Sequence, residues 1–297
     1  MPKIEYIPKK FKEDKVVLIN RVNEIIAEYE EQGYSLTLRQ VYYQLVARDV
    51  IPNNERSYKN LGVLINDARL AGEIDWEAIV DRTRFLRKMS HWSDPMDILR
   101  AAANQFSVNR WEEMDTYCEV WVEKDALIDV VEQICKSYDV NCLSCRGYVS
   151  QSTMWESAQR LSEIGKEITI FHLGDHDPSG KDMSRDMEDR LRLFGADVRF
   201  ERIALNFDQI ETYNPPPNPT KLTDSRATGY ISEFGYECWE LDALEPRIIT
   251  ELIESKICSV MDKEIYEAAE NREFAERRMM RDFVSKYPEF AENESTN

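Results

Sequence analysis

An apolar run that ends in two aspartates constrains this chain more than any other part of its sequence. Residues 168–173 are typical of a buried parallel strand, and Pro178 with Gly180 predicts that a helix begins soon after it. Side chains alternate along a strand, so we expect Asp175 and Asp177 to point to the same side at its carboxyl end, where open α/β sheets bind ligands. Two adjacent carboxylates suit a hard cation such as Mg²⁺, although a loop of solvated acids is the simpler interpretation.

A second predicted strand changes that interpretation. Residues 117–122 form another short apolar run, followed by Glu123 and then by a helical spacing of apolar residues. If the two strands are parallel members of one sheet, Glu123 lies beside Asp175 and Asp177 at its carboxyl edge. Three carboxylates that converge in this way predict a site for a divalent cation.

Three ordered motifs carry a resemblance to a known fold. They are Glu123-Lys-Asp-Ala, then Arg146-Gly-Tyr, then Asp175-His-Asp-Pro-Ser-Gly. Together with the strands and helices around them they resemble a Toprim domain, the Rossmann-like, mostly parallel Mg²⁺-binding fold of topoisomerases, bacterial-type primases and some nucleases. The residues within the motifs most resemble the A subunit of DNA topoisomerase VI and its meiotic double-strand-break relatives. The resemblance implies that Glu123, Asp175 and Asp177 hold Mg²⁺.

The N-terminal part of the chain is predicted to be mostly helical. Apolar spacing indicates helices over residues 14–31, 37–48 and 55–71, and residues 79–84 are typical of a short strand with alternating arginines. Three helices and such a strand resemble a winged helix, which presents polar side chains to a DNA groove. A small helical domain with a solvated charged face explains the same pattern equally well.

Charge is unevenly distributed along the chain. Its 297 residues carry a net charge of -18, which argues against a protein that coats nucleic acid non-specifically. Residues 36–90, by contrast, hold nine Lys and Arg against seven Asp and Glu. If the chain contacts DNA, we expect the contact in this segment. Its candidate DNA-binding residues are Arg56, Lys59, Arg69, Arg82 and Arg84.

A pair of tyrosines lies in the second predicted helix. Apolar spacing that begins at Leu38 places Tyr42 on the buried face, so we expect Tyr43 to be exposed, with Arg39 four residues earlier on the same face. In topoisomerase VI A subunits a winged-helix-like domain precedes the Toprim domain and carries the catalytic tyrosine in an Arg-x-x-Tyr-Tyr motif. The resemblance therefore assigns Tyr43 as the nucleophile, and Arg39 is the candidate cation beside it.

These patterns predict an α/β protein with four parts. Residues 1–92 form the winged-helix-like domain, 93–114 a linker helix, 115–258 the Toprim domain, and 259–297 a C-terminal helix whose last residues, from 289, are disordered.

Two segments of the predicted Toprim domain have less regular patterns. The proline-rich residues 214–219 predict an extended surface loop. Residues 236–244 predict a strand that leads to a helix, and they resemble the Glu-x-x-Ala-Leu segment late in the same family. Glu240 and Asp242 there either support the metal site or form a polar strand edge.

The resemblance implies a Mg²⁺-dependent, type II topoisomerase-like enzyme that cleaves and rejoins double-stranded DNA. In the family the tyrosine of one subunit works with the metal site of the other, so a homodimer is expected. No Gly-x-x-x-x-Gly-Lys loop is present, which makes a separate B-type ATPase subunit of the GHKL type an implied partner. Because the sequence lacks a signal peptide and a transmembrane pattern, we expect no membrane association and a cytoplasmic, nucleoid-associated protein of prokaryotic, phage or plasmid origin.

Two other functions remain open. A Toprim nuclease, similar to the nuclease subunit of condensin-like plasmid-defence systems, would hydrolyse DNA with metal-activated water and would not use Tyr43. A non-catalytic DNA-binding module would use the basic segment alone. Cys142 and Cys145 are spaced like a redox or zinc pair, but on a strand this spacing sends them to opposite faces, which disfavours both roles.

Overall fold

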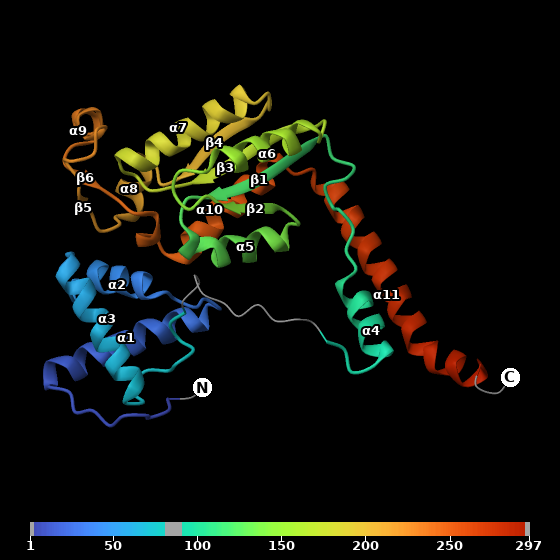
Figure 1. Ribbon diagram of the computed structural model, residues 1–297, viewed down its shortest axis with the longest axis horizontal. Helices are drawn as coiled ribbons and strands as arrows, with labels where there is room; N and C mark the ends of the chain where they lie inside the picture. Colours follow the sequence, from blue (N-terminus) through green and yellow to red (C-terminus); the bar gives the residue numbers. More distant parts are fainter. Residues whose placement is uncertain (1–2, 81–90, 295–297) are drawn as a thin grey trace.

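The computed structural model describes residues 3–80 and 91–294, with side chains up to residue 286. It is an α/β structure in which an N-terminal group of helices lies against one end of a parallel sheet that is covered by helices on both faces (Figure 1). None of the described helices combines the length and the apolar character that are needed to span a bilayer.

The three predicted N-terminal helices are confirmed. They are α1 (Glu13–Glu31), α2 (Leu38–Ala47) and α3 (Glu55–Leu70), and they pack around a shared apolar core. Thr37 caps α2: its side chain accepts a hydrogen bond from the backbone of Gln40, and the Gln40 side chain accepts one from the Thr37 backbone. Of the strand expected over residues 79–84, Ile79 forms a single parallel bridge to Leu36, and residues 81–84 lie outside the described residues.

The central sheet has four parallel strands. They are β1 (Thr116–Val122), β2 (Asn141–Ser144), β3 (Glu167–Leu173) and β4 (Arg199–Ala204), in the spatial order β2-β1-β3-β4. The prediction that residues 117–122 and 168–173 form parallel neighbours is therefore confirmed, with Val122 opposite Leu173. This register places the residues that follow the two strands side by side.

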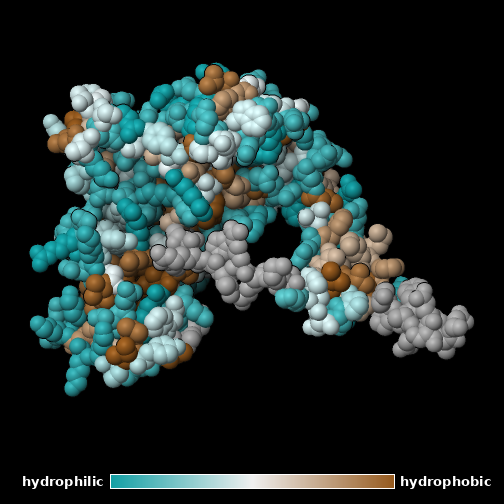
Figure 2. Space-filling model, viewed as in Figure 1, coloured by the Kyte–Doolittle hydropathy of each residue, from teal (hydrophilic) through white to brown (hydrophobic). Residues whose placement is uncertain are grey.

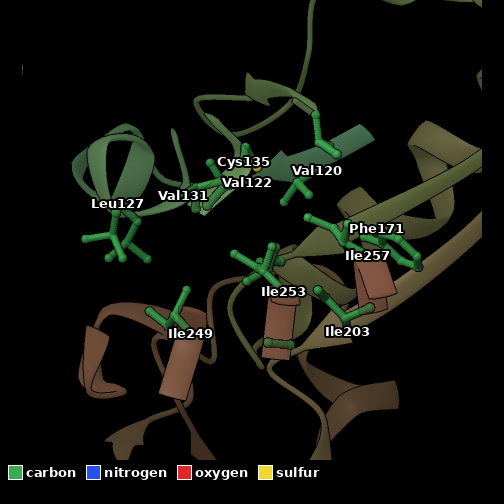
Figure 3. Packing of buried hydrophobic residues seen from close by; sticks show 14 of the residues in the cluster. Val120, Val122, Leu127, Val131, Cys135, Phe171, Ile203, Ile249, Ile253 and Ile257 are labelled. Atoms are coloured by element: carbon green, nitrogen blue, oxygen red, sulfur yellow. The ribbon is translucent and has the colours of Figure 1, made fainter. Parts of the chain in front are cut away.

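Helices cover both faces of this sheet. A short turn, η1 (Asp125–Leu127), leads into α5 (Ile128–Ser137), which packs with α10 (Pro246–Val260) on one face. On the opposite face lie α6 (Gln151–Ser162) and α7 (Pro178–Leu193). Figure 3 shows the apolar core on the α5 and α10 side, where isoleucines of α10 face strand residues: Ile249, Ile253, Ile257, Val120, Val122 and Phe171.

Strand alternation also separates the two cysteines of β2 and its following turn. Cys142 packs against the core on the α5 and α10 side, whereas Cys145 lies in the core on the α6 and α7 side. The predicted opposite orientation is confirmed.

The segment after β4 departs from the prediction. It contains α8 (Phe207–Tyr213), α9 (Ala227–Phe234) and η2 (Leu241–Ala243). It also contains a short antiparallel hairpin of β5 (Asn218–Pro219) and β6 (Glu237–Cys238), whose long connection includes α9. The strand expected over residues 236–244 is thus wrong except at its start, because Trp239 pairs with His176 and the chain then turns into η2. The loop expected over residues 214–219 ends in the hairpin.

Two helices project from the sheet domain as an arm (Figure 1). The arm consists of α4 (Pro95–Gln105) and α11 (Lys263–Glu294), and it is joined to the body where Arg110 pairs with Glu273, 3.1 Å away. The expected linker helix of residues 93–114 is confirmed only over Pro95–Gln105, and the helix of residues 263–294 extends past the point where a disordered tail was expected. Figure 2 shows apolar residues on the surface of the arm, among them Ile98, Met279 and Phe283.

Candidate active site

Glu123 and Asp175 meet at the carboxyl edge of the sheet. Because Val122 and Leu173 are paired, the residue after each strand lies at the same level, and the Glu123 backbone N–H donates to the Leu173 carbonyl at 2.8 Å. The Glu123 carboxylate in turn accepts a hydrogen bond from the Asp175 backbone N–H, also at 2.8 Å. The structure therefore brings these two predicted site residues together.

Asp175 is buried among charged groups. One of its carboxylate oxygens accepts a hydrogen bond from the Leu241 backbone at 2.7 Å, and the other lies 3.0 Å from the Lys124 ammonium. Burial, together with the negative charges of Glu123 and Asp242, raises the pKa of Asp175 to about 8. Burial likewise raises the pKa of Glu123. Both shifts indicate that burial disfavours the ionised forms of these two acids more than the neighbouring cations favour them.

Asp177 has a different set of partners. The strand ends at Leu173, so both aspartates belong to the following turn and the side-chain alternation of a strand does not govern them. Asp177 caps α7 by accepting a hydrogen bond from the Gly180 backbone at 2.6 Å. Gly180 has to be glycine, because a Cβ there would lie 2.3 Å from the Asp175 carbonyl oxygen. The turn thus brings the backbone of α7 into close contact with the acids.

Lys124 lies at the centre of the acidic residues. Its ammonium is 2.7 Å from Glu240 and 2.8 Å from Asp242, in addition to Asp175, and its side chain is only 17% exposed. Arg39 of α2 pairs with the same two late acids, its Nε 3.3 Å from Asp242. Glu240 and Asp242 therefore lie at the site and are not a polar strand edge.

Arg202 binds the backbone of the acidic turn. It lies on β4, and its guanidinium donates hydrogen bonds to the backbone carbonyls of Gly174, Asp175 and Gly180 at 2.8, 2.5 and 3.1 Å. Sequence reasoning missed this residue. An arginine directly before the apolar residues 203–205 was the available signal, because a buried guanidinium needs several acceptors.

The expected exposure of Tyr43 is wrong. Its side chain is buried, with 3% of the residue exposed, and its hydroxyl accepts a hydrogen bond from the Asn218 side-chain amide at 3.1 Å. A helical wheel describes one helix, whereas this tyrosine is covered by the β5–β6 hairpin of the other domain. Burial and the charges of Glu240 and Asp242 raise the pKa of Tyr43 above its ordinary value, so the phenol is protonated at neutral pH. Arg39 lies near it, 6.0 Å from the ring centroid.

A cavity connects the tyrosine to the acids. It has a volume of about 540 Å³ and lies between the N-terminal helices and the end of the sheet. Tyr43, Arg39, Asp177, Asn218 and Glu240 are among the residues that line it. Residues of one chain therefore bring the candidate nucleophile and a candidate metal ligand to the same space, which differs from the two-subunit arrangement that the resemblance implies.

The candidate DNA-binding residues differ in their surroundings. Arg56 is exposed on α3, and exposed Lys59 pairs with Glu55 at 2.7 Å. Arg69 is turned inward instead, donating to the backbone carbonyls of Trp76 and Ile79, so its guanidinium supports the fold of its own domain. The last two candidates, Arg82 and Arg84, lie outside the described residues.

The donors at the sheet edge fit a hard divalent cation in their chemistry, since all of them are carboxylates. The orientation of these carboxylates does not suit a metal, however. Among residues 3–80 and 91–286, no group of three or more His, Cys, Asp and Glu side chains is arranged to hold a metal ion. Lys124, Arg39 and backbone N–H groups engage these carboxylates. A cation has to compete with these groups.

Comparison with known proteins assigns no family to the chain. No protein-family model matches it, and a search of curated proteins finds no significant match.

Proposed function

We propose that this chain is a Mg²⁺-dependent DNA-cleaving transesterase of the topoisomerase VI A-subunit type, in which Tyr43 forms a phosphotyrosyl link. One observation carries the proposal: Tyr43, Arg39 and Asp177 line a single cavity, and Asp177 belongs to the same turn as Asp175, whose backbone donates to Glu123. In this proposal the parallel sheet with acids at its carboxyl edge is a Toprim domain, and the N-terminal helices are a winged-helix-like DNA-binding domain.

The reaction requires a nucleophile and stabilisation of charge at the phosphate. The Tyr43 oxygen attacks the DNA phosphorus and the bond from phosphorus to the 3′-oxygen breaks. The phenol proton passes to solvent and the departing oxygen takes one up, which gives a phosphotyrosyl ester and a 3′-hydroxyl. Arg39, already beside the ring, stabilises the negative charge on the phosphate. Mg²⁺ held by Glu123, Asp175 and Asp177 would neutralise the phosphate and the departing oxygen. Reversal of the same step rejoins the strand.

DNA can enter beside Tyr43 only when the two domains move apart, and they close on it again before attack, because only 3% of Tyr43 is exposed and its hydroxyl is bound by Asn218 of the other domain. The polar contacts that cross this boundary include the pairs of Arg39 with Glu240 and Asp242, and a hydrogen bond from Tyr34 to Thr250 at 3.1 Å. Polar interdomain boundaries of this kind permit relative domain motion. We therefore infer that the structure is a closed state of the enzyme.

The resemblance also suggests the partners. The substrate would be double-stranded DNA, two copies of the chain would cut its two strands, and a separate B-type subunit would supply ATPase activity. The protein would act in the cytoplasm, at the nucleoid.

A metal-dependent nuclease is the second candidate, and the burial of Tyr43 favours it. The raised pKa of this phenol makes it a poor nucleophile in the closed state, whereas metal-activated water needs no side chain from the N-terminal domain. The two candidates predict different DNA ends.

The test uses supercoiled plasmid and Mg²⁺, with the reaction stopped by detergent and divided into samples with and without protease. We expect wild type to leave protein-linked breaks, and Tyr43→Phe to leave none while it folds normally. Tyr236→Phe is the control, because Tyr236 is 71% exposed and lies away from the cavity. Protein-free ends that persist in Tyr43→Phe would establish the nuclease, and DNA binding without any cleavage would reject both enzymes.

A further inference from the structure

A series of side-chain hydrogen bonds joins the two tyrosines of α2 through the other domain. The Tyr42 hydroxyl donates to the Asn53 amide oxygen at 2.8 Å, and the Asn53 amide nitrogen donates to the Asn218 amide oxygen at 2.9 Å. The Asn218 nitrogen then donates to the Tyr43 hydroxyl at 3.1 Å. Asn53 lies just before α3 and Asn218 lies in β5, so this Asn53–Asn218 relay crosses the domain boundary.

The same hairpin is fixed to the acidic turn. Asn218 pairs with Cys238 in the two-stranded ladder, and the next residue, Trp239, exchanges both backbone hydrogen bonds with His176 at 2.8 and 2.9 Å. His176 lies between the two aspartates of the candidate metal site, and Glu240 follows Trp239. Backbone pairing therefore fixes the position of Asn218 relative to the acidic turn, and Asn218 binds the Tyr43 hydroxyl.

We propose that Asn218 is a positioning residue, which holds the Tyr43 hydroxyl in a fixed relation to the acid cluster and stabilises the negative charge that develops on its oxygen during attack. This inference rests on the proposed transesterase. The amide of Asn53 sets the orientation of Asn218, because it donates to the Asn218 oxygen and leaves the Asn218 nitrogen to face the phenol. The charged groups that also face the phenol are Arg39, Glu240 and Asp242.

The expected effect follows from the loss of one donor to a charged oxygen. Hydrogen bonds to charged groups contribute about 1.5–3 kcal/mol, which corresponds to a roughly ten- to a hundredfold change in rate. Asn218→Ala should therefore slow formation of the covalent adduct by this factor in single turnover at saturating DNA. Its affinity for DNA should stay at the wild-type value, because the hydrogen bonds of Asn218 go to Asn53, Tyr43 and Glu240 and not to the exposed Arg56 and Lys59 of α3.

A spectroscopic measurement tests the placement of the phenol without DNA. The protein is labelled with 3-fluorotyrosine, and the ¹⁹F resonance of Tyr43 is assigned by its absence in Tyr43→Phe. We expect this resonance to move in Asn218→Ala and, by less, in Asn53→Ala, which removes only the support of Asn218. Asn66→Ala is the matched control, since Asn66 is exposed on α3.

The two measurements separate the two proposals. A Tyr43 resonance that is unchanged in both relay variants overturns the role of Asn218, whatever the enzyme does to DNA. A shifted resonance with an unchanged adduct rate also overturns it. If wild type forms no adduct although the resonance shifts, the transesterase fails, while the placement of the phenol by Asn218 is supported. Should Asn218→Ala fail to fold, the Asn53→Ala variant decides the question by the same two criteria.

Discussion

Replacing Lys124 with methionine removes the ammonium group that lies among three acids, of which Asp175 and Asp242 are buried. Asp175, Glu240 and Asp242 are all within 3.0 Å of this group, and the Asp242 side chain is 1% exposed. Loss of one partner from a buried ion pair costs about 3–5 kcal/mol. At pH 9, where Asp175 is ionised, Arg39 still pairs with Glu240 and Asp242, so the loss falls mainly on Asp175 and the lower value, about 3 kcal/mol, applies. A change of this size lowers the melting temperature by on the order of 10 °C.

The same substitution also tests whether the acids bind a divalent cation. Because Lys124 competes with a divalent ion for the acids, we expect Mg²⁺ to raise the melting temperature of Lys124→Met more than that of wild type. Binding at a hundred times the dissociation constant would restore about 2.7 kcal/mol, close to the whole loss. The assay is thermal unfolding followed by circular dichroism, with and without Mg²⁺.

Lys136→Met is the matched control for this experiment. Lys136 is 73% exposed and pairs with Glu132 on the surface of α5, so its removal should leave the melting temperature unchanged. A Lys124→Met variant as stable as wild type would refute the role of Lys124 as a buried counterion. Equal stabilisation of both proteins by Mg²⁺ would refute competition at this site.

Two further predictions concern the acidic turn. The pKa of Asp175 is raised from 3.8 to about 8, so between these values the metal-free folded state keeps a proton that the unfolded state has released. Stability to urea should therefore decline as the pH rises from about 4 to about 8, and the stabilisation by Mg²⁺ should grow over the same range. A flat stability profile in wild type, or a sloping one that Asp175→Asn does not flatten, would contradict this. Gly180→Ala places a Cβ 2.3 Å from the Asp175 carbonyl oxygen and 3.0 Å from the Glu123 carboxylate, so DNA cleavage should be lost. Gly229→Ala is the control and should cleave normally, because its added Cβ meets no neighbouring atom within 4 Å. Equal cleavage by the two variants would show that the acidic turn tolerates the added Cβ.

The sequence by itself determined the elements and the meeting of Glu123 with Asp175. Local spacing of apolar residues predicted the three N-terminal helices and the strands β1 and β3 to within a few residues, because one face of each helix and both faces of each strand have to be buried. Parallel pairing of two strands then required their carboxyl ends to lie together, and the structure has Glu123 and Asp175 in direct hydrogen-bond contact there. This meeting of the two acids could be predicted because it depends only on the pairing of two neighbouring strands.

The surroundings of these acids were decided by the tertiary structure alone. Lys124 contacts Glu240, Arg39 contacts Asp242, and Asn218 contacts Tyr43, each across more than a hundred residues of sequence. Amphipathic spacing reports which face of a helix is apolar within its own domain, and it predicted an exposed Tyr43. Whether another domain covers that face depends on how two separately folded surfaces pack, and the short hairpin that covers Tyr43 has too few residues to leave a periodic signal.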